Sequence, residues 1–234
     1  MRYPGGKGKC FQHVINLLPP HRTYIETHLG GGAVLRHKAP AVNSYGIDLD
    51  PHVVNHWQKQ FPQLAKYIIA DAVEILASWP FRGDEVVYCD PPYLAATRRR
   101  HRVYRCDYTE EDHSRLITTL RDIPCFVVLS GYPSALYDEL LPDWNTAEFP
   151  AKTHVGIRTE RLWFNYTPPA HLHDASYLGC TFRERQTVKR RLHRLQNRIA
   201  GLTATEKFEI FKWINQHLDR EEDAHARLLF SKRG

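Results

Sequence analysis

Glu85-Val86-Val87-Tyr88-Cys89-Asp90-Pro91-Pro92-Tyr93 is the stretch that decides how this chain folds. Its first five residues are mostly apolar and β-branched, which predicts a buried strand over 85–89. The next four lie where that strand ends, and in an open α/β sheet ligands bind in the crevice outside the carboxyl ends of the strands. The two prolines fix φ and favour extended backbone before them, so Asp90 and Tyr93 are held apart on a stiff frame.

The two side chains at the ends of this frame have different chemical uses. The carboxylate of Asp90 can accept hydrogen bonds from an exocyclic amine. The ring of Tyr93 can stack on a flat base. Together they predict an enzyme that acts on the amino group of a nucleobase.

Strand-like and helix-like segments alternate on both sides of this stretch. Such alternation implies a largely parallel sheet with helices on both faces, so the expected fold class is α/β, doubly wound. The expected strands are 23–26, 44–48, 67–71, 85–89, 125–130, 146–149 and 161–166, and the expected helices are 10–18, one that starts at 33, 52–61, 72–78 and 109–121.

The composition changes after Thr167-Pro168-Pro169, and the pattern is helical from Thr181 onward. Residues 183–198 contain seven Arg or Lys against one Glu. We therefore expect a main domain over 1–170 and a basic helical C-terminal extension over 171–234. A narrow apolar seam runs along the first helix of the extension and consists of Val188, Leu192, Leu195, Ile199 and Leu202.

Composition narrows the class of protein. The 234 residues carry a net charge of +6 and a pI near 9.1, which favours a polyanionic partner, although solubility alone would also account for it. The five cysteines include no C-x-x-C pair, which indicates reduced thiols and excludes a disulfide framework or a zinc site. No apolar run approaches the length of a membrane span, and the N-terminus lacks an apolar signal core, so a cytoplasmic location is expected.

A glycine-rich turn, Glu26-Thr27-His28-Leu29-Gly30-Gly31-Gly32, lies between an expected strand and an expected helix. Glycines at such a position let the backbone approach a ligand at a helix N-terminus. The turn is not a phosphate-binding P-loop, because no G-K-[ST] closes it.

Two further expected strands end in acids. Asp48 follows Gly30 at close to the spacing at which an acid bonds the ribose of a nucleotide, although a lone aspartate is more often a solvated turn residue. Asp71 ends the next strand, where it could accept from an adenine amine or act as the N-cap of the helix that begins at Ala72. The sequence leaves these two interpretations of Asp71 open.

Three more segments make a family resemblance specific. They are Arg2-Tyr3-Pro4-Gly5-Gly6-Lys7, the turn Glu26 to Gly32, and Thr159-Glu160-Arg161-Leu162-Trp163-Phe164-Asn165. With Asp90-Pro91-Pro92-Tyr93 as its catalytic motif, the chain resembles the Dam-like (D12) class of S-adenosylmethionine-dependent DNA adenine-N6 methyltransferases. The four segments occur in the family's order and span residues 1 to about 167.

The resemblance implies a Rossmann-like methyltransferase sheet and roles for the matching residues. Asp90 and the carbonyl of Pro91 would accept the two N6 hydrogens of an adenine flipped out of double-stranded DNA, and Tyr93 would stack on it. No metal is required. The cofactor S-adenosylmethionine would be bound by Tyr3, Lys7, Glu26, Gly30, Gly31, Gly32, Asp48 and Asp71.

The chain also departs from this family. Thr27 and His28 replace the usual proline and phenylalanine. Only eighteen residues separate Asp71 from Asp90, where the family places its target-recognition insert. Base recognition must therefore come from elsewhere, and the basic loop 94–110 is the first candidate. Its expected DNA-binding residues are Arg98, Arg99, Arg100, Arg102, Tyr104 and Arg105. The basic helix 183–198 is a second region, which would either follow phosphates or be the solvated face of a docked helix.

Several alternatives stay open at this point. The same motif would serve cytosine-N4 methylation of DNA or adenine-N6 methylation of RNA, because it recognises an amino group and does not choose the ring. A DNA-binding protein that has lost catalysis could keep the scaffold. The recognition sequence, a restriction-enzyme partner and the oligomeric state are not determined by the sequence.

Overall fold

The structure is a computed structural model, which describes residues 7–8, 10–97, 106–153 and 156–231 but not the side chains of 152–153 and 218–231. The chain forms two compact units, Met1–Tyr177 and Leu178–Gly234, and each is described by itself. The change of composition in the sequence predicts a division at 170. The first unit extends to Tyr177 because its last residues are bonded to it: the His173 amide donates to the Leu18 carbonyl at 3.0 Å.

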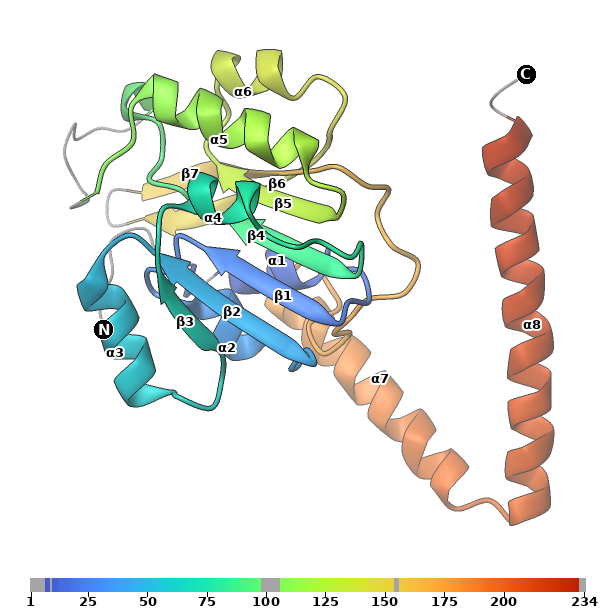
Figure 1. Cartoon of the computed structure of the whole chain (residues 1–234). Coiled ribbons are helices and arrows are strands. Elements are labelled where there is room, and N and C mark those ends of the chain that lie inside the picture. The colour runs from blue at the N-terminus through green and yellow to red at the C-terminus, as the bar shows by residue number, and fades with distance from the viewer. Residues whose placement is uncertain (1–6, 9, 98–105, 154–155, 232–234) are drawn as a thin grey trace. The chain divides into compact units, whose positions relative to one another are not determined.

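The core of the first unit is a seven-stranded sheet (Figure 1). Its strands are β1 (Thr23–Thr27), β2 (Asn43–Asp48), β3 (Lys66–Ile69), β4 (Glu85–Cys89), β5 (Phe126–Gly131), β6 (Asn145–Thr153) and β7 (Gly156–Phe164). They lie in the order β3-β2-β1-β4-β5-β7-β6, and β1 to β5 pair in parallel. The strand order reverses at β1 and β4, which is the switch point where doubly wound sheets bind ligands.

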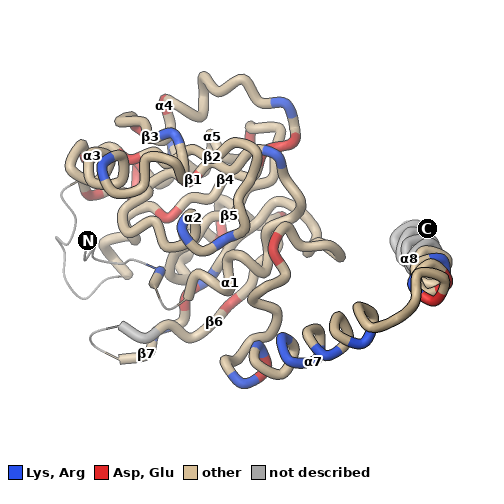
Figure 2. Tube along the Cα trace, turned by 90° about the horizontal axis from the view of Figure 1, so that it is seen from below, with Lys and Arg blue, Asp and Glu red and all other residues tan. Residues whose placement is uncertain are grey.

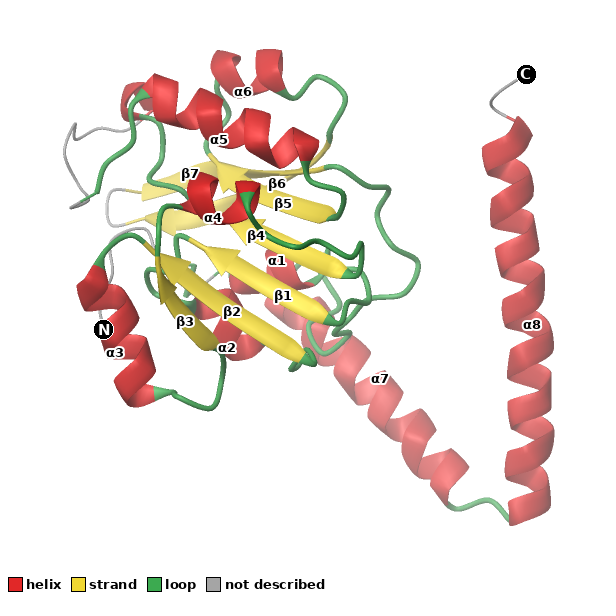
Figure 3. Cartoon of the chain, viewed as in Figure 1, coloured by secondary structure: helices red, strands yellow, loops and turns green. Residues whose placement is uncertain are grey.

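Helices cover both faces of this sheet (Figure 3). On one face lie α1 (Phe11–Ile15), α2 (Ala33–His37) and α3 (Pro51–Gln60), and on the other α4 (Ala72–Ala77), α5 (Glu110–Asp122) and α6 (Ala135–Leu140). Strand β4 shows why both faces are covered: Val86 and Tyr88 enter the first cluster, and Val87 and Cys89 enter the second. A strand whose consecutive residues are apolar must bury both of its faces. The α/β sheet with helices on both faces is thus confirmed.

The last two strands depart from the parallel pattern. β7 is antiparallel to both β5 and β6, and it lies between them. The ladder between β6 and β7 runs from the Asn145–Phe164 pair to the Thr153–Gly156 pair. β6 is therefore longer than the expected strand 146–149. β7 starts earlier than the expected strand 161–166 and ends two residues before it. So short a connection allows only an antiparallel pair, because a parallel one needs a crossover of about a dozen residues.

Local sequence signals account for the helix ends. Thr109 and Asp112 form the expected capping box at the start of α5: the Thr109 hydroxyl accepts from the Asp112 amide, and the Asp112 carboxylate accepts from the Thr109 amide at 2.9 Å. α1 ends at Ile15, earlier than the expected 18, and tighter turns carry the chain on to Pro19-Pro20. None of the helices in the described ranges combines the length and apolarity that crossing a membrane would require.

Candidate active site

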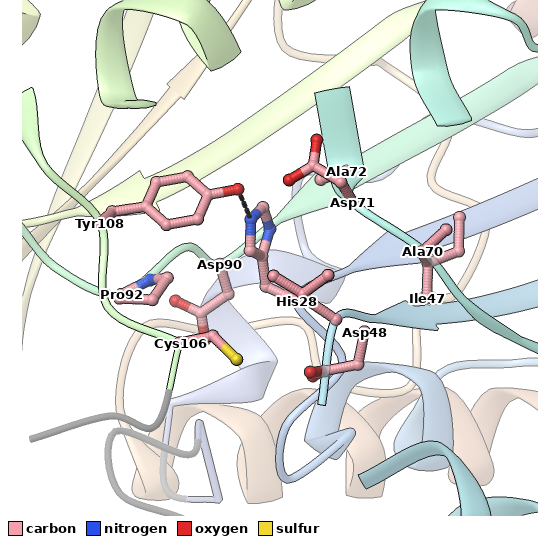
Figure 4. Close-up of a pocket in the computed structure, with 11 residues that line it drawn as sticks. His28, Ile47, Asp48, Ala70, Asp71, Ala72, Asp90, Pro92, Cys106 and Tyr108 are labelled. Carbon is pink, nitrogen blue, oxygen red and sulfur yellow. Dashed lines mark hydrogen bonds between the residues drawn. The ribbon is translucent and has the colours of Figure 1, made fainter. Parts of the chain in front are cut away.

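A cavity lies at the carboxyl edge of the sheet, beside the switch point (Figure 4). Its empty space is about 480 Å³, including the mouth open to solvent. Acids that follow three strands meet here: Asp48 ends β2, Asp71 follows β3 and Asp90 follows β4. The other lining residues are His28, Ile47, Leu49, Ala70, Ala72, Pro92, Cys106 and Tyr108.

The Asp90 carboxylate is fixed through one of its oxygens. Its Oδ1 accepts from Lys7 Nζ at 2.5 Å and from the Ser130 hydroxyl at 2.7 Å. Ser130 is fully buried on β5, the strand next to β4. Both of these donors contact Oδ1 and neither contacts Oδ2. The carboxylate is therefore held in one orientation through a single oxygen.

Lys7 lies at the centre of a buried charge cluster. It is 3% exposed, and besides Asp90 it donates to the Tyr93 hydroxyl and lies 3.6 Å from Glu160 Oε2. Burial alone would lower the pKa of Lys7, but the nearby carboxylate of Asp90, with Tyr88 and Glu160, outweighs it, and the pKa is well above its ordinary value. Burial also raises the pKa of Glu160, despite the opposing effect of Lys7.

The ring of Tyr93 is covered in this structure. It is 6% exposed, and the ring of Tyr132 packs on it in a T-shaped contact with centroids 4.5 Å apart. Arg158 in turn holds Tyr132, with its guanidinium 4.9 Å from the Tyr132 centroid, and donates to the Thr97 carbonyl at 2.7 Å. A base could stack on Tyr93 only after one of these neighbours moves.

The glycine turn carries backbone that only glycine adopts easily. Gly30 and Gly32 have φ of 41° and 51°, and Gly31 lies between them. A Cβ at Gly32 would lie 2.4 Å from the Trp57 ring, so a larger residue could not fit there. The Gly30 amide donates to Asp48 Oδ2 at 2.9 Å, which brings the turn and the end of β2 together. Burial raises the pKa of Asp48, although the hydrogen bonds that it accepts from the Gly30 and Asp50 amides oppose the shift.

Asp71 fulfils the N-cap role. Its Oδ1 accepts from the amides of Val73 and Glu74 at 2.9 and 3.2 Å, at the start of α4. The same side chain lines the cavity (Figure 4). The cap and the expected contact with a cofactor amine are therefore compatible.

His28 and Tyr108 form one wall of the cavity (Figure 4). His28 Nε2 lies 2.8 Å from the Tyr108 hydroxyl, and His28 Nδ1 lies 3.0 Å from the Thr27 hydroxyl. Burial lowers the pKa of His28 to about 3, so its ring is neutral at physiological pH. Thr27 and His28, the two residues that differ from the family pattern, are thus hydrogen-bonded to each other.

Glu26 is not among the residues that line this cavity. It is 3% exposed, and its Oε2 accepts from the Tyr24 hydroxyl and from the Leu35 amide, both at 2.8 Å. It thereby ties β1 to α2. Burial raises the pKa of Glu26 to about 8, against the lowering effect of these hydrogen bonds.

The raised pKa of Glu26 predicts a pH-dependent stability. Between its ordinary pKa of 4.5 and about 8, the folded protein binds a proton that the unfolded chain has released, so stability falls as pH rises through this range. We expect Glu26→Gln to remove this loss, on the order of a few kcal/mol. Urea unfolding across this pH range measures it, with the exposed Glu209→Gln as control. Parallel pH profiles of the wild type and Glu26→Gln would contradict the prediction.

Three neighbours of the site were not predicted from the sequence. Ser130, Tyr132 and Glu160 complete the surroundings of Asp90 and Tyr93. One feature of the sequence could have identified Ser130 as a site residue: it is a hydroxyl residue at the end of an otherwise apolar expected strand. No group of three or more possible metal ligands occurs in the described part of the chain. The expected residues that lie outside it are Tyr3, Arg98, Arg99, Arg100, Arg102, Tyr104 and Arg105.

One known family matches the part of the chain that contains the Asp90–Tyr93 motif. Residues 80–149 match the family model of D12 class N6 adenine-specific DNA methyltransferases. The match contains β4 and the whole Asp90–Tyr93 motif, so the resemblance is confirmed over this part of the chain, and it supports methyl transfer, which in this family uses S-adenosylmethionine. Among curated proteins, none matches the sequence.

Solved structures resemble the fold at low identity. Precorrin 8W decarboxylase from Methanobacterium thermoautotrophicum is 11% identical, over 70% of this chain and 94% of that one, with a TM-score of 0.48. Magnesium protoporphyrin IX methyltransferase from Synechocystis PCC 6803, with bound SAH, is 15% identical over 67% and 82%, with a TM-score of 0.45. TrmK from M. capricolum, in complex with S-adenosyl-homocysteine, is 9% identical over 88% and 93%, with a TM-score of 0.46. All three TM-scores are below 0.5, and the strand order of the sheet itself defines the fold.

Proposed function

We propose that this protein transfers a methyl group from S-adenosylmethionine to N6 of an adenine in double-stranded DNA. The observation that carries the proposal is the shared cavity of Asp90 and Pro92, from the motif, with Asp48 and Asp71, from the neighbouring strands. The family match over 80–149 supports the choice of adenine and of DNA.

The lining of the cavity fits an adenosyl group. Asp48 offers carboxylate oxygens to ribose hydroxyls, and Asp71 offers an acceptor to an adenine amine. Ile47, Ala70 and Ala72 supply apolar surface between them. The bound cofactor would supply an electrophilic methyl group on a sulfonium.

Asp90 would act on the amine that receives the methyl group. An aromatic amine is a poor nucleophile, because its lone pair is conjugated with the ring. With Oδ1 held by Lys7 and Ser130, Asp90 Oδ2 can accept one N6 hydrogen while the Pro91 carbonyl accepts the other. Two fixed acceptors favour a tetrahedral nitrogen and stabilise the positive charge that develops on it. The orientation of the Asp90 carboxylate is set before the substrate arrives, so reorganisation is needed only where Tyr132 covers Tyr93.

Ser130 would be a positioning residue for this step. Ser130→Ala removes one of the two donors to Asp90 Oδ1 and lets the carboxylate rotate. We expect kcat to fall about tenfold, while affinity for S-adenosylmethionine stays unchanged because Ser130 does not line the cavity. Steady-state kinetics and calorimetry measure the two quantities, with Ser114→Ala, a helical serine away from the site, as control. Equal loss of kcat and of cofactor affinity would assign Ser130 a merely structural role.

The function itself is tested by methyl transfer to defined nucleic acids. Radiolabelled S-adenosylmethionine is incubated with the full chain and with duplex DNA, with the same DNA carrying N6-methyladenine at every adenine, and with the equivalent RNA. Label on the first substrate alone, recovered as N6-methyladenine after digestion, is the expected result. Label recovered on cytosine or RNA would redirect the substrate, and cofactor binding without transfer to any of them would indicate a binding protein.

A further inference from the structure

The first helix of the second unit, α7 (Phe182–Ala200), carries a continuous stripe of arginines. At 3.6 residues per turn, five arginines fall within an arc of about 100°. All five side chains are exposed, and Figure 2 shows the basic residues distributed along α7. We call this set the arginine stripe; it consists of Arg183, Arg190, Arg191, Arg194 and Arg198.

The charge of the stripe is not neutralised within the described residues. None of the five arginines forms an ion pair with a described acid. The single acid of the helix, Glu184, is engaged at the N-terminus, where it accepts from the amides of Cys180 and Thr181 at 2.8 and 3.2 Å. A helix with this much unpaired charge of one sign is suited to a polyanion.

The arginine stripe is separate from the apolar side of the helix. Val188, Leu192, Leu195 and Ile199 fall in their own arc of about 60°, and its centre lies roughly 120° from the centre of the stripe. The arginines are therefore not the rim of an apolar contact. Any cover over the seam would leave them accessible.

The length and chemistry of the stripe match a phosphodiester backbone. From Arg183 to Arg198 it spans about 22 Å at 1.5 Å per residue. Phosphates along one DNA strand advance by about 3.4 Å per nucleotide, so several lie within reach. All five residues are arginine, whose planar guanidinium forms paired hydrogen bonds with phosphate oxygens.

We propose that α7 binds the sugar–phosphate backbone of duplex DNA through the arginine stripe. The choice of DNA among polyanions rests on the proposed function. DNA is favoured over an anionic lipid surface because membrane-surface helices present Trp, Phe and Leu on the buried face, whereas the apolar arc of α7 is narrow and contains no aromatic residue. Backbone contacts hold a protein on DNA without choosing a sequence.

The test compares two triple variants of the full chain with equal loss of charge. Arg191→Ala/Arg194→Ala/Arg198→Ala removes three members of the stripe, and Lys189→Ala/Lys207→Ala/Lys212→Ala removes three exposed lysines outside it. Affinity for a mixed-sequence duplex of about 20 base pairs is measured by fluorescence anisotropy over a series of salt concentrations. Alanine favours helix, so neither variant should unfold α7, and circular dichroism checks this.

The stripe variant is expected to bind DNA about tenfold more weakly at low salt, with a salt slope reduced by about 2.7, or 0.9 for each lost phosphate contact. The lysine variant should keep nearly the full slope. Equal losses in both variants, or none, would overturn the proposal. So would binding of the wild type to phosphatidylserine vesicles that depends on the stripe while DNA binding does not.

The outcomes also separate this proposal from the proposed function. If the wild type methylates DNA and the stripe variant binds DNA normally, only the role of α7 fails. If DNA binding depends on the stripe but no methyl transfer occurs on any nucleic acid, only the enzymatic proposal fails. Binding of S-adenosylmethionine should be equal in all three proteins, because the stripe contributes nothing to the cavity.

Discussion

Replacing Asp90 by alanine is expected to reduce methyl transfer by about 10²–10³-fold while the protein still binds S-adenosylmethionine. Asp90 supplies an acceptor whose position is set by two other side chains, Lys7 and Ser130. Without it the target amine loses a partner that stabilises its developing positive charge, and losing one fixed group of this kind costs about 10²–10³ in kcat. Asp48 and Asp71, the expected cofactor ligands, remain in place.

Asp90→Asn separates chemistry from shape. The amide keeps the size of the side chain, and its oxygen can still accept from Lys7 and Ser130. Its NH₂ group would then point toward the substrate amine, so a donor would face a donor. We expect a loss close to that of alanine, measured as kcat with saturating cofactor, and unchanged cofactor affinity by calorimetry. Activity near that of the wild type in Asp90→Asn would exclude Asp90 as the amine acceptor.

Replacing Lys7 by methionine is expected to reduce both stability and activity. Lys7 neutralises Asp90 at 2.5 Å and approaches Glu160 at 3.6 Å, and both Lys7 and Glu160 are almost completely buried. Removing one partner of a buried ion pair leaves uncompensated charge and destabilises a protein by about 3–5 kcal/mol. The Tyr93 hydroxyl loses the hydrogen bond from Lys7 at the same time. Urea unfolding at neutral pH measures the change in free energy, with the exposed Lys59→Met as control.

A second substitution tests the cause. If the loss in Lys7→Met comes from unpaired carboxylates, adding Glu160→Gln should recover part of the stability, because it removes one of the two negative charges. Activity should not recover, since Asp90 still lacks the donor that orients it. A double variant no more stable than Lys7→Met would mean that packing, and not charge, made Lys7 important.

Much of the fold follows from local patterns. The apolar run 85–89 had to be a buried strand, and it is β4, with alternate residues in two core clusters. Acids at strand ends could be placed at the binding edge of the sheet, and Asp48, Asp71 and Asp90 do share a cavity. The turn at Gly32 could be expected to require glycine, and a Cβ at this position would collide with the Trp57 ring. Such features depend on periods of two and 3.6 residues, which a short stretch of sequence contains.

The sequence by itself determined the strands, the motif at the end of β4 and the basic character of the C-terminal helix. Only the tertiary structure decided that Ser130 and Lys7, 40 and 83 positions from Asp90 in the chain, hold the same oxygen, that Tyr132 covers Tyr93, and that β7 lies between β5 and β6. The physical reason is that a local pattern chooses the element and the face it buries. Which atoms then meet depends on strand order and register, and these are set by how the whole sheet packs.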